Sequence, residues 1–581
     1  MENCIAERVN ALRDYLRRNG LHAFIFPSTD PHQGEYVPAH WQTRQWISGF
    51  DGSAGTAVVT LSDAALWTDS RYFIAAAKQL EGTPFQLMKD GLPETPSIEE
   101  WICKQLKEGE VVGIDGELLP LEGEDGWGSA FGKAGIKLRT DLDPAEDLWT
   151  DRPPIPKNKV EIQPLEFAGE SAESKIERVR QALREQNADS IVISQLDNIA
   201  WLLNLRGSDV HCNPVFVSYV LLTLNEVTLF IDSEKLDKET SNYLKGLGVK
   251  VMPYRDPSKS PHKGETSKKA LPLGEGLGGS LIGSLKSVKN EAEIEGFRRA
   301  MIRDGVAMVK FLRWLKPAVE AGGETELSID RKLTALRAEQ ELYRGLSFDT
   351  IAAYGHHGAI VHYEATPESD IVLEPKGLLL LDSGAQYQDG TTDITRTIPL
   401  GALTDEERLD YTLVLKGHIR LALTRFPDGI SGTRIDALAR YAMWQHGIDY
   451  GHGTGHGVGS YLCVHEGPHQ IRHTWKPAPL HAGMTVTNEP GIYREGKHGV
   501  RIENTMLIVE DGETEFGKFL RLEPLTLCPI DLSPVIWDMM TQEETDYINN
   551  YHKKVYEALS PFLNNEERQW LKVPSVAIPS Q

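Results

Sequence analysis

The chain has 581 residues, of which 40% are hydrophobic and 25% charged, and its formal net charge is −23. Because hydrophobic cores stop growing beyond about 250–300 residues, the length predicts several domains. The acidic balance argues against a general nucleic-acid binder or a protein that docks on anionic membranes. No stretch of about 18 apolar residues occurs, so no membrane-spanning helix is expected.

The chain start and the cysteines indicate the cellular compartment. The segment Met1–Glu7 carries acidic residues early and lacks the apolar core of a signal peptide. The five cysteines are scattered, odd in number and without a C-x-x-C pair, so neither a disulfide framework nor a zinc–thiolate site is expected. We therefore expect a cytoplasmic protein with reduced thiols.

The first two segments of the chain follow one plan, in which a helix precedes a buried strand, a tryptophan element and further strands. Helices that alternate with strands predict α/β domains. The matching pairs are helices at Ile5–Asn19 and Ile176–Gln186, strands at Ala23–Phe26 and Ser190–Ile193, tryptophan elements at Trp46–Phe50 and Trp201–Gly207, and strand ends at Trp67–Ser70 and Phe230–Ser233.

Two polar breaks predict the domain boundaries. Residues 151–156 are rich in proline and precede a polar stretch to Lys175, and residues 257–283 are rich in Lys, Ser, Pro and Gly. The predicted fold class is therefore α/β and α+β. The predicted domains are an α/β domain at 1–152, a related α/β domain at 153–287, and a larger α+β domain at 288–581 with a helical extension from about 526.

The third domain carries clear helix signals. Ile294, Phe297, Met301 and Met308 recur at helical spacing. Thr404 and Glu407 form a capping box that opens a further helix, and Thr433 is predicted to cap the next one. Strands are expected at Met484–Asn488 and Val500–Val509.

Two motifs match chemical signatures only formally. Gly274–Gly279 fits G-x-G-x-x-G, but the polar stretch before it favours a loop over a dinucleotide site. His465–His469 fits H-E-x-x-H, which binds zinc only on a helix. Pro468 removes a helical hydrogen bond there, so we expect no zinc-protease helix.

The first candidate metal ligands are two aspartates. Asp382 ends the apolar run Gly377–Leu381, which predicts a buried strand, and Asp393 follows eleven residues later. The intervening Gln388–Gly390 predicts a turn, so a hairpin can bring the two carboxylates together. A carboxylate at the end of an apolar strand is costly to bury without a cation or strong donors nearby.

Three further candidates lie downstream. His456 sits in a glycine-rich segment, whose glycines let the backbone approach a ligand closely. Glu489 ends one strand-like segment, and Glu503 lies on another. Taken one at a time, each of these side chains also fits a structural role. Together, four carboxylates and one imidazole suit a pair of divalent ions, with Mn²⁺ favoured and Co²⁺, Fe²⁺ or Zn²⁺ possible. Such a pair can share a water and lower its pKa.

These motifs resemble those of the pita-bread metallopeptidases, and most closely the three-domain cytosolic type of Xaa-Pro aminopeptidase. The resemblance covers nearly the whole chain, and no ligand position departs from it. The segments that carry it are Leu381–Ala385, Thr392–Arg396, Gly451–Gly457, Asn488–Gly491 and Arg501–Asn504, with Asp30–His32 and Ile47–Thr56 in the first domain.

The resemblance implies a role for each site residue. Asp382 would chelate one metal, Asp393 and Glu503 would bridge, and His456 and Glu489 would bind the other, with Glu489 also relaying a proton. The catalytic positions that it implies beyond these ligands are His362, His452, His465, Tyr493 and Arg501. A structural hydrogen bond remains the alternative for each of these five.

The resemblance also implies two creatinase-like N-terminal domains, a pita-bread catalytic domain and a homodimer. The implied activity is hydrolysis of the N-terminal Xaa-Pro bond of oligopeptides by a water or hydroxide that bridges two metal ions. The implied partners are peptides with proline at position 2, without nucleic acid or membrane. Two alternatives stay open at this point: a prolidase, which cleaves dipeptides, and a non-catalytic binding protein on the same fold.

Overall fold

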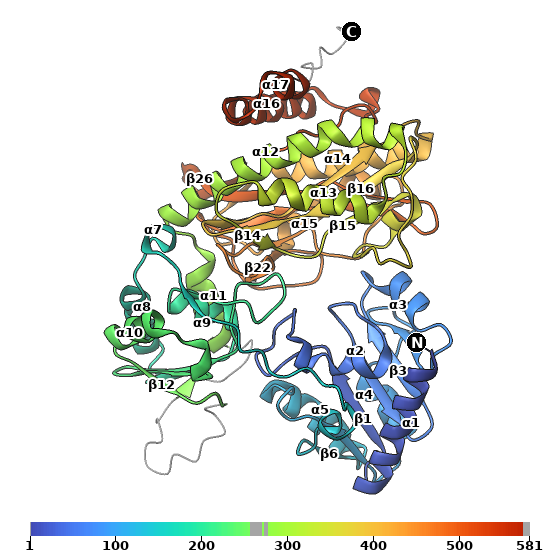
Figure 1. Ribbon diagram of the computed structural model, residues 1–581, viewed down its shortest axis with the longest axis vertical. Coiled ribbons are helices and arrows are strands. Elements are labelled where there is room, and N and C mark those ends of the chain that lie inside the picture. The colour runs from blue at the N-terminus through green and yellow to red at the C-terminus, as the bar shows by residue number, and fades with distance from the viewer. Residues whose placement is uncertain (1, 256–269, 272–276, 573–581) are drawn as a thin grey trace. The chain divides into compact units, whose positions relative to one another are not determined.

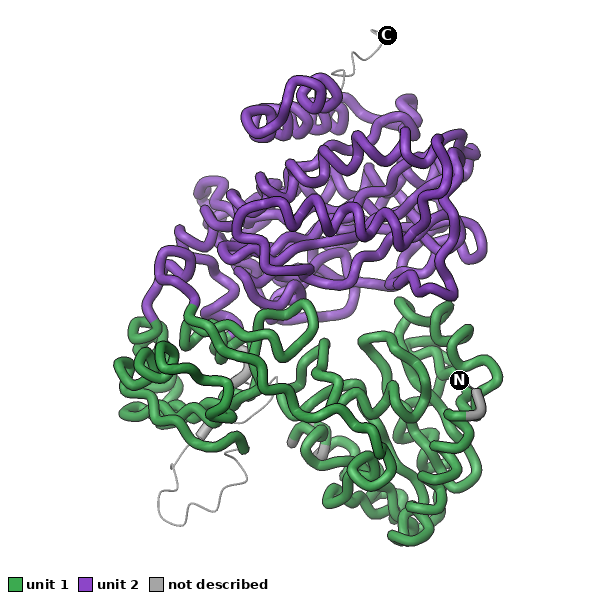
Figure 2. The backbone as a smooth tube through the Cα atoms, viewed as in Figure 1, with its two compact units in different colours: residues 1–162, 172–282 green, residues 163–171, 283–581 purple. Residues whose placement is uncertain are grey.

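The computed structural model describes residues 2–255, 270–271 and 277–572, and the formally matching G-x-G-x-x-G segment lies in part outside them (Figure 1). Contacts divide the chain into two compact units (Figure 2). The first unit is Met1–Ile162 with Ala172–Ile282, and the second is Gln163–Ser171 with Gly283–Gln581.

The first sheet of unit 1 is mixed, with strand order β4-β3-β2-β1-β5-β6. β1 pairs antiparallel with β2 and parallel with β5, and helices flank the sheet. The strands are β1 (Ala23–Pro27), β2 (Thr56–Thr60), β3 (Ala64–Thr68), β4 (Gln86–Lys89), β5 (Val111–Ile114) and β6 (Lys137–Arg139). The helices are α1 (Glu2–Asn19), α2 (Thr43–Ser48), α3 (Phe73–Gln79), α4 (Ile98–Gln105), α5 (Leu121–Lys133) and α6 (Pro144–Leu148).

The second sheet repeats this topology, with order β12-β11-β10-β8-β13. β8 pairs antiparallel with β10 and parallel with β13, as β1 does with β2 and β5. The predicted internal duplication is therefore confirmed in the pairing pattern. The strands of this sheet are β8 (Ser190–Ile193), β10 (Tyr219–Thr223), β11 (Val227–Phe230), β12 (Val249–Met252) and β13 (Ala270–Leu271), while β7 (Glu161–Ile162) and β9 (Leu205–Arg206) pair with each other in a separate two-stranded sheet. The helices are α8 (Ala172–Glu185), α9 (Leu196–Leu202), α10 (Lys238–Gly246) and α11 (Leu277–Ser287), of which α11 continues into unit 2.

Unit 2 packs long helices over several small sheets (Figure 1). Its sheets are β14-β17-β18, β15-β16-β19, β20-β27-β26-β23, β21-β22 and β24-β25. The helices are α7 (Leu165–Ala168), α12 (Glu291–Ala321), α13 (Glu326–Ala338), α14 (Asp405–Ala422), α15 (Thr433–Trp444), α16 (Gln542–Leu559) and α17 (Asn565–Leu571). The strands are β14 (Tyr343–Leu346), β15 (Ile351–Tyr354), β16 (Leu378–Ser383), β17 (Ala385–Tyr387), β18 (Gly390–Thr391), β19 (Ile394–Pro399), β20 (Arg425–Pro427), β21 (Gly455–Gly457), β22 (Glu466–Ile471), β23 (Thr485–Asn488), β24 (Gly491–Arg494), β25 (His498–Arg501), β26 (Asn504–Thr514) and β27 (Gly517–Pro524).

Most of the local predictions for unit 2 are confirmed. The capping box of Thr404 and Glu407 opens α14, and Tyr387 pairs with Gly390 across the predicted turn. The predicted cap at Thr433 is wrong, because Gly432 occupies that position. Thr433 instead donates its hydroxyl hydrogen to the carbonyl of Thr474, so a tertiary contact uses the side chain that local capping would have used.

Two sequence-based expectations concern features that are absent. In the part of the chain that the structure describes, no helix combines the length and the apolar character needed to span a membrane. All five cysteines lie in that part, and no disulfide joins any of them, as expected. Residues 163–171, predicted as part of a polar linker, instead include α7 and belong to unit 2.

The contact between α12 and the turn at Asp389 has no room for a side chain at Gly296, where a Cβ would lie 2.1 Å from the Asp389 carbonyl oxygen. Gly296→Ala should therefore lower the free energy of unfolding by about 1–3 kcal/mol, which is the usual cost of overpacking. Denaturant unfolding measures the change. Gly132→Ala in α5 is the control, since its Cβ meets nothing within 4 Å; it should be neutral or stabilise by about 0.5–1 kcal/mol. Equal effects of the two variants would contradict the packing argument.

Candidate metal centre

Asp382 lies near the end of β16, a strand whose residues are all buried. Its Oδ2 accepts a hydrogen bond of 2.7 Å from Nη2 of Arg501. Its Oδ1 is also buried and has no hydrogen-bond partner in the described part of the chain. A buried carboxylate oxygen without a donor is costly, which makes this atom a position where a cation would be stabilising.

Asp393 reaches the same place through strand pairing. β16 pairs antiparallel with β19, and Asp382 lies opposite Thr395. Since side chains two residues apart share a face of an extended chain, Asp393 and Thr395 point the same way. The Thr395 hydroxyl donates to Oε2 of Glu503 over 2.7 Å, which holds that carboxylate beside the two aspartates.

His456 enters the cluster from β21. Its Nδ1 lies 2.8 Å from the Gly457 carbonyl oxygen and therefore carries a hydrogen, which leaves Nε2 facing the carboxylates. That nitrogen lies 3.4 Å from Oδ2 of Asp393 and 3.4 Å from Oε1 of Glu489. The glycines let β21 lie close to the neighbouring strand β23, because a Cβ at Gly455 would lie 1.9 Å from the Thr487 carbonyl oxygen. The expected approach of this backbone to a ligand stays a prediction.

The two glutamates follow strand ends. Glu489 comes directly after β23 and its backbone N–H donates to the Thr454 carbonyl over 2.8 Å. Glu503 lies between β25 and β26, and its backbone N–H donates to the Thr395 carbonyl over 3.1 Å. Ligand atoms of Asp393, His456 and Glu503 all lie within 4.8 Å of one another. These backbone bonds fix both glutamates relative to the aspartate and histidine strands.

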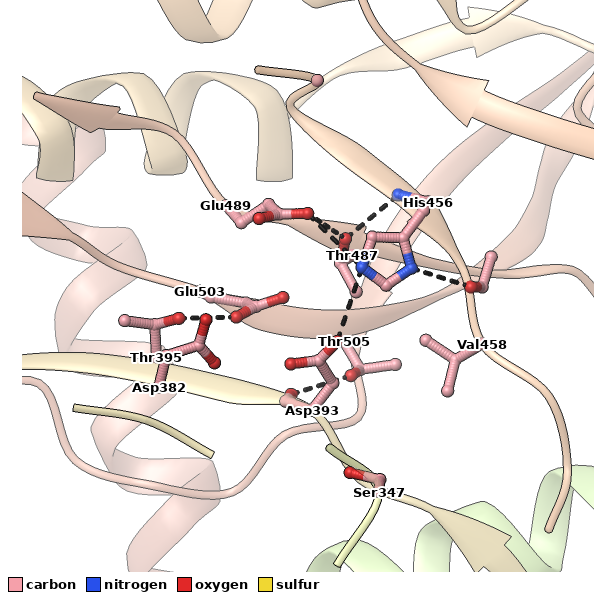
Figure 3. A network of polar contacts seen from close by, with 12 residues as sticks. Ser347, Asp382, Asp393, Thr395, His456, Val458, Thr487, Glu489, Glu503 and Thr505 are labelled. Carbon is pink, nitrogen blue, oxygen red and sulfur yellow. Dashed lines mark hydrogen bonds and ion pairs between the residues drawn. The ribbon is translucent and has the colours of Figure 1, made fainter. Parts of the chain in front are cut away.

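Figure 3 shows the result, in which five side chains from distant parts of the sequence line one space. Asp393, Glu489, Glu503 and His456 point toward one another, and Asp382 lies beside Glu503 next to Thr395. The convergence that the sequence predicts for these five residues is therefore present in the fold.

The pKa shifts show how unfavourable this cluster is without cations. Burial, together with the charge of Asp393, outweighs the effect of Arg501 and raises the pKa of Asp382 to about 6. Burial and the neighbouring carboxylates also raise the pKa of Glu489 and, much further, that of Glu503. Burial lowers the pKa of His456, but Asp393 and Glu489 outweigh it and raise that pKa to about 9. Bound protons thus offset part of the negative charge of these side chains. Divalent cations supply the same offset and suit these oxygen and nitrogen donors.

A chain of hydrogen bonds extends from Asp382 to a second histidine. Arg501 bonds Asp382 with Nη2 and donates from Nη1 to the Tyr493 hydroxyl over 2.7 Å. That hydroxyl lies 2.8 Å from Nε2 of His452, whose Nδ1 bonds the Gly453 carbonyl. Burial raises the pKa of Tyr493 to about 12 against the opposing effect of Arg501, so the phenol keeps its proton and donates to His452. Three predicted positions therefore form one network with the metal-ligand candidate Asp382.

The remaining two predicted positions lie next to this network. The His465 ring meets the His456 ring edge to face, with centroids 4.3 Å apart. His362 follows Val361, whose carbonyl accepts a hydrogen bond of 3.3 Å from Nη2 of Arg501. The His465 ring thus contacts the cluster directly. The backbone of Val361, which precedes His362, bonds Arg501 at the edge of the cluster.

The H-E-x-x-H segment is not a zinc helix. Glu466–Ile471 forms β22, and Nε2 of the buried His469 bonds the Thr485 carbonyl over 2.7 Å. The Glu466 carboxylate is buried between the ammonium groups of Lys286 and Lys289. His469 and Glu466 are therefore engaged elsewhere, and the segment is a strand and not a helix, as Pro468 indicated.

Sequence reasoning missed the residues that support the ligands. Thr395 positions Glu503, and the Thr487 hydroxyl donates to Glu489 over 3.1 Å. Each stands two residues from a candidate ligand on a strand, so the alternation of side chains was the signal that could have identified it.

Comparison with known proteins gives the same picture. Residues 295–510 match the model of metallopeptidase family M24, and residues 8–140 and 151–293 both match the creatinase/prolidase N-terminal domain. Residues 518–575 match the C-terminal region of peptidase M24. The predicted fold class, two related creatinase-like domains followed by a pita-bread domain, is confirmed. The exact boundaries at 152 and 287 stay predictions.

Relatives that match over nearly the whole length show which kind of protein with these domains the chain is similar to. It is 38% identical to aminopeptidase P1 of Arabidopsis thaliana over 98% of both chains, and 39% identical to Xaa-Pro aminopeptidase 1 of Dictyostelium discoideum over 98% of this chain and 96% of that one. The solved X-prolyl aminopeptidase of Caenorhabditis elegans, described as a cytosolic enzyme with a di-nuclear active site, superposes with a TM-score of 0.91 at 36% identity over 98% of both chains.

The chain therefore belongs to metallopeptidase family M24. Within that family, its full-length likeness is to the three-domain Xaa-Pro aminopeptidases of the P type.

The pH dependence of the metal-free protein tests the electrostatics of the cluster. Because the folded-state pKa of Asp382 is raised from 3.8 to about 6, the folded state holds this proton more tightly than the unfolded chain. The resulting stability is complete below about pH 4 and is lost as the pH rises through about 6. In chelator-treated protein, the free energy of unfolding of the wild type relative to Asp382→Asn should fall over this range by up to about 3 kcal/mol.

Denaturant unfolding of both proteins between about pH 4 and pH 8 measures this difference. Addition of a divalent metal to the wild type should reverse the loss above pH 6, since metal then replaces the proton. A difference that does not change with pH would contradict the raised pKa of Asp382.

Proposed function

We propose that this protein is a metallo-aminopeptidase that removes the first residue of oligopeptides whose second residue is proline. The observation that carries the proposal is the convergence of four carboxylates and one imidazole on one space (Figure 3). The full-length likeness to Xaa-Pro aminopeptidases supports the substrate class.

Five residues would hold two divalent ions: Asp382, Asp393, His456, Glu489 and Glu503. Asp382 would bind one ion, Asp393 and Glu503 would bridge, and His456 with Glu489 would bind the other. When bound, such a pair polarises the scissile carbonyl and lowers the pKa of a water to provide the nucleophile. The family membership and the di-nuclear centre of the C. elegans relative support two divalent ions. The hard, carboxylate-rich donor set supports manganese as their identity.

The proline bond explains why such a site is needed. An Xaa-Pro bond is a tertiary amide without an N–H, so an enzyme cannot grip it through that group. Recognition must instead use the carbonyl, the free α-amine and the pyrrolidine ring. His452 and His465 are proposed to flank the ring, since both lie beside the carboxylate cluster without forming part of it.

Three further roles are proposed for Glu489, His362 and Arg501. Glu489 is the carboxylate of the cluster that is partly exposed, and it is proposed to take the proton of the attacking water and pass it to the leaving proline nitrogen. His362 is proposed to stabilise the oxyanion of the tetrahedral intermediate. Arg501 holds Asp382 and the Tyr493 hydroxyl in place, so the ligand and the His452 side chain keep a fixed relation.

Two finer points belong to the same proposal. The cytoplasm is the proposed location, which the description of the C. elegans relative as a cytosolic enzyme supports. A homodimer is proposed from the family resemblance noted in the sequence.

A substrate panel tests the activity. With Mn²⁺ added, the protein should release the first residue from an Xaa-Pro-Xaa tripeptide, and should act at least about 100-fold less well on an Xaa-Ala-Xaa peptide. Chromatography of the products, with kcat/KM for each peptide, gives the comparison. Preferential cleavage of Xaa-Pro dipeptides would instead establish a prolidase.

The Asp393→Asn variant tests the metal centre. It removes one charge from the cluster and should lower kcat/KM by at least about 100-fold, with a matching loss of bound metal by elemental analysis. Glu495→Gln is the control, because that carboxylate is exposed and lies between β24 and β25. Unchanged metal content in Asp393→Asn would overturn the ligand assignment.

A further inference from the structure

The buried guanidinium of Arg396, on β19 directly after Thr395, forms no direct ion pair within the described residues. Arg396 is 2% exposed, yet each of its six hydrogen-bond acceptors is uncharged. They are the carbonyl oxygens of Thr395, Glu503, Cys528 and Pro529, Oδ1 of Asn504 and the hydroxyl of Tyr551, all between 2.6 and 3.1 Å away. A buried charge of this kind is kept only if its hydrogen bonds are satisfied throughout.

Two of these bonds reach the strands of the metal centre. Nη1 of Arg396 donates to the Glu503 carbonyl over 2.6 Å and to the Thr395 carbonyl over 2.9 Å. The side chains of the same two residues bond each other inside the cluster. Arg396 therefore fixes, from behind, the backbone from which the Glu503 carboxylate projects.

A third bond continues the network to the other glutamate. Asn504 accepts from Arg396 with Oδ1, so its amide nitrogen faces Nε2 of His418 at 3.4 Å. Nδ1 of His418, on α14, donates to the Asn488 carbonyl over 3.1 Å, and Asn488 precedes Glu489. The backbone next to both candidate glutamate ligands thus rests on one buried set of polar groups.

The outermost member of this set comes from the C-terminal extension. Tyr551 lies on α16, beyond the residues that match the M24 catalytic model, and its ring packs in the core beside α14. Its hydroxyl lies 3.0 Å from Nη2 of Arg396 and accepts that hydrogen bond. The same hydroxyl lies 2.9 Å from the Cys528 carbonyl and 3.1 Å from that of Thr526, to either of which it can donate.

We infer that α16 supports the metal centre, because its Tyr551 acts as a positioning residue for Glu503 through Arg396. The inference rests on the proposed function, because it assigns the metal-ligand role to Glu503. The two hydrogens of Nη2 share three acceptors, which are the Tyr551 hydroxyl, Oδ1 of Asn504 and the Cys528 carbonyl, so loss of the Tyr551 hydroxyl leaves them two. The guanidinium then turns toward Asn504 and Cys528, and the Glu503 and Asn504 backbone that it holds moves with it.

Tyr551→Phe tests this in the full-length chain. Chelator-stripped protein is titrated with Mn²⁺ by calorimetry, and the variant should bind about 10-fold or more weakly, as is usual when a group that orients a metal ligand is lost. Excess Mn²⁺ should restore kcat to near the wild-type value with KM unchanged. A residue that acted only on stability would leave the Mn²⁺ affinity of the folded protein unaltered.

The matched control is Tyr547→Phe, one turn earlier on the same helix. The two rings lie parallel, at 3° and 6.3 Å between centroids, but the buried Tyr547 hydroxyl has no hydrogen-bond partner in the described part of the chain. This variant should bind Mn²⁺ as the wild type does.

The outcomes separate the two proposals. Equal Mn²⁺ affinity of Tyr551→Phe and Tyr547→Phe overturns the inference and leaves the proposed function intact. A wild-type chain that binds no Mn²⁺ overturns both. If Tyr551→Phe does not fold, Arg396→Lys replaces it in the same titration, since a lysine keeps the charge without the planar fork; weakened binding supports the inference, and unchanged binding overturns it.

Discussion

The mutual repulsion of four carboxylates in a buried space is the constraint on which the rest of unit 2 depends. Asp382, Asp393, Glu489 and Glu503 are drawn together around one imidazole (Figure 3). The raised pKa values of Asp382, Glu489 and Glu503 show that without added positive charge the protein prefers to hold protons there. A fold keeps such an arrangement only where cations make it favourable, and this connects the architecture to hydrolytic chemistry.

Most of the contacts that hold these carboxylates in place come from uncharged groups. Backbone bonds tie Glu503 to Thr395, and hydroxyls of Thr395 and Thr487 orient two of the carboxylates. Arg501 donates directly to the candidate ligand Asp382, while Arg396 donates to the backbone carbonyl oxygens of Thr395 and Glu503. One positively charged group thus contacts a candidate ligand, and the other fixes the backbone next to one.

The duplicated sheets of unit 1 and the helical extension of unit 2 illustrate two different uses of added structure. The two sheets share one pairing pattern, although their loops and lengths differ. The extension instead packs into the catalytic core, where the Tyr551 hydroxyl accepts a hydrogen bond from the buried Arg396. Helix α16 therefore has a physical link to the site that its amphipathic sequence did not reveal.

The sequence by itself determined what depends on local chemistry: the helix at α12, the capping box of α14, the turn before Asp393, and the ligand types. Strong periodicity and turn residues act over a few positions, so they can be read without the fold. Only the tertiary structure decided which buried polar groups meet. The Thr433 hydroxyl donates to the Thr474 carbonyl and not to its own helix, and five of the six acceptors of Arg396 lie more than a hundred residues away in the sequence. Such pairings are set by how strands and helices pack, which no local pattern encodes.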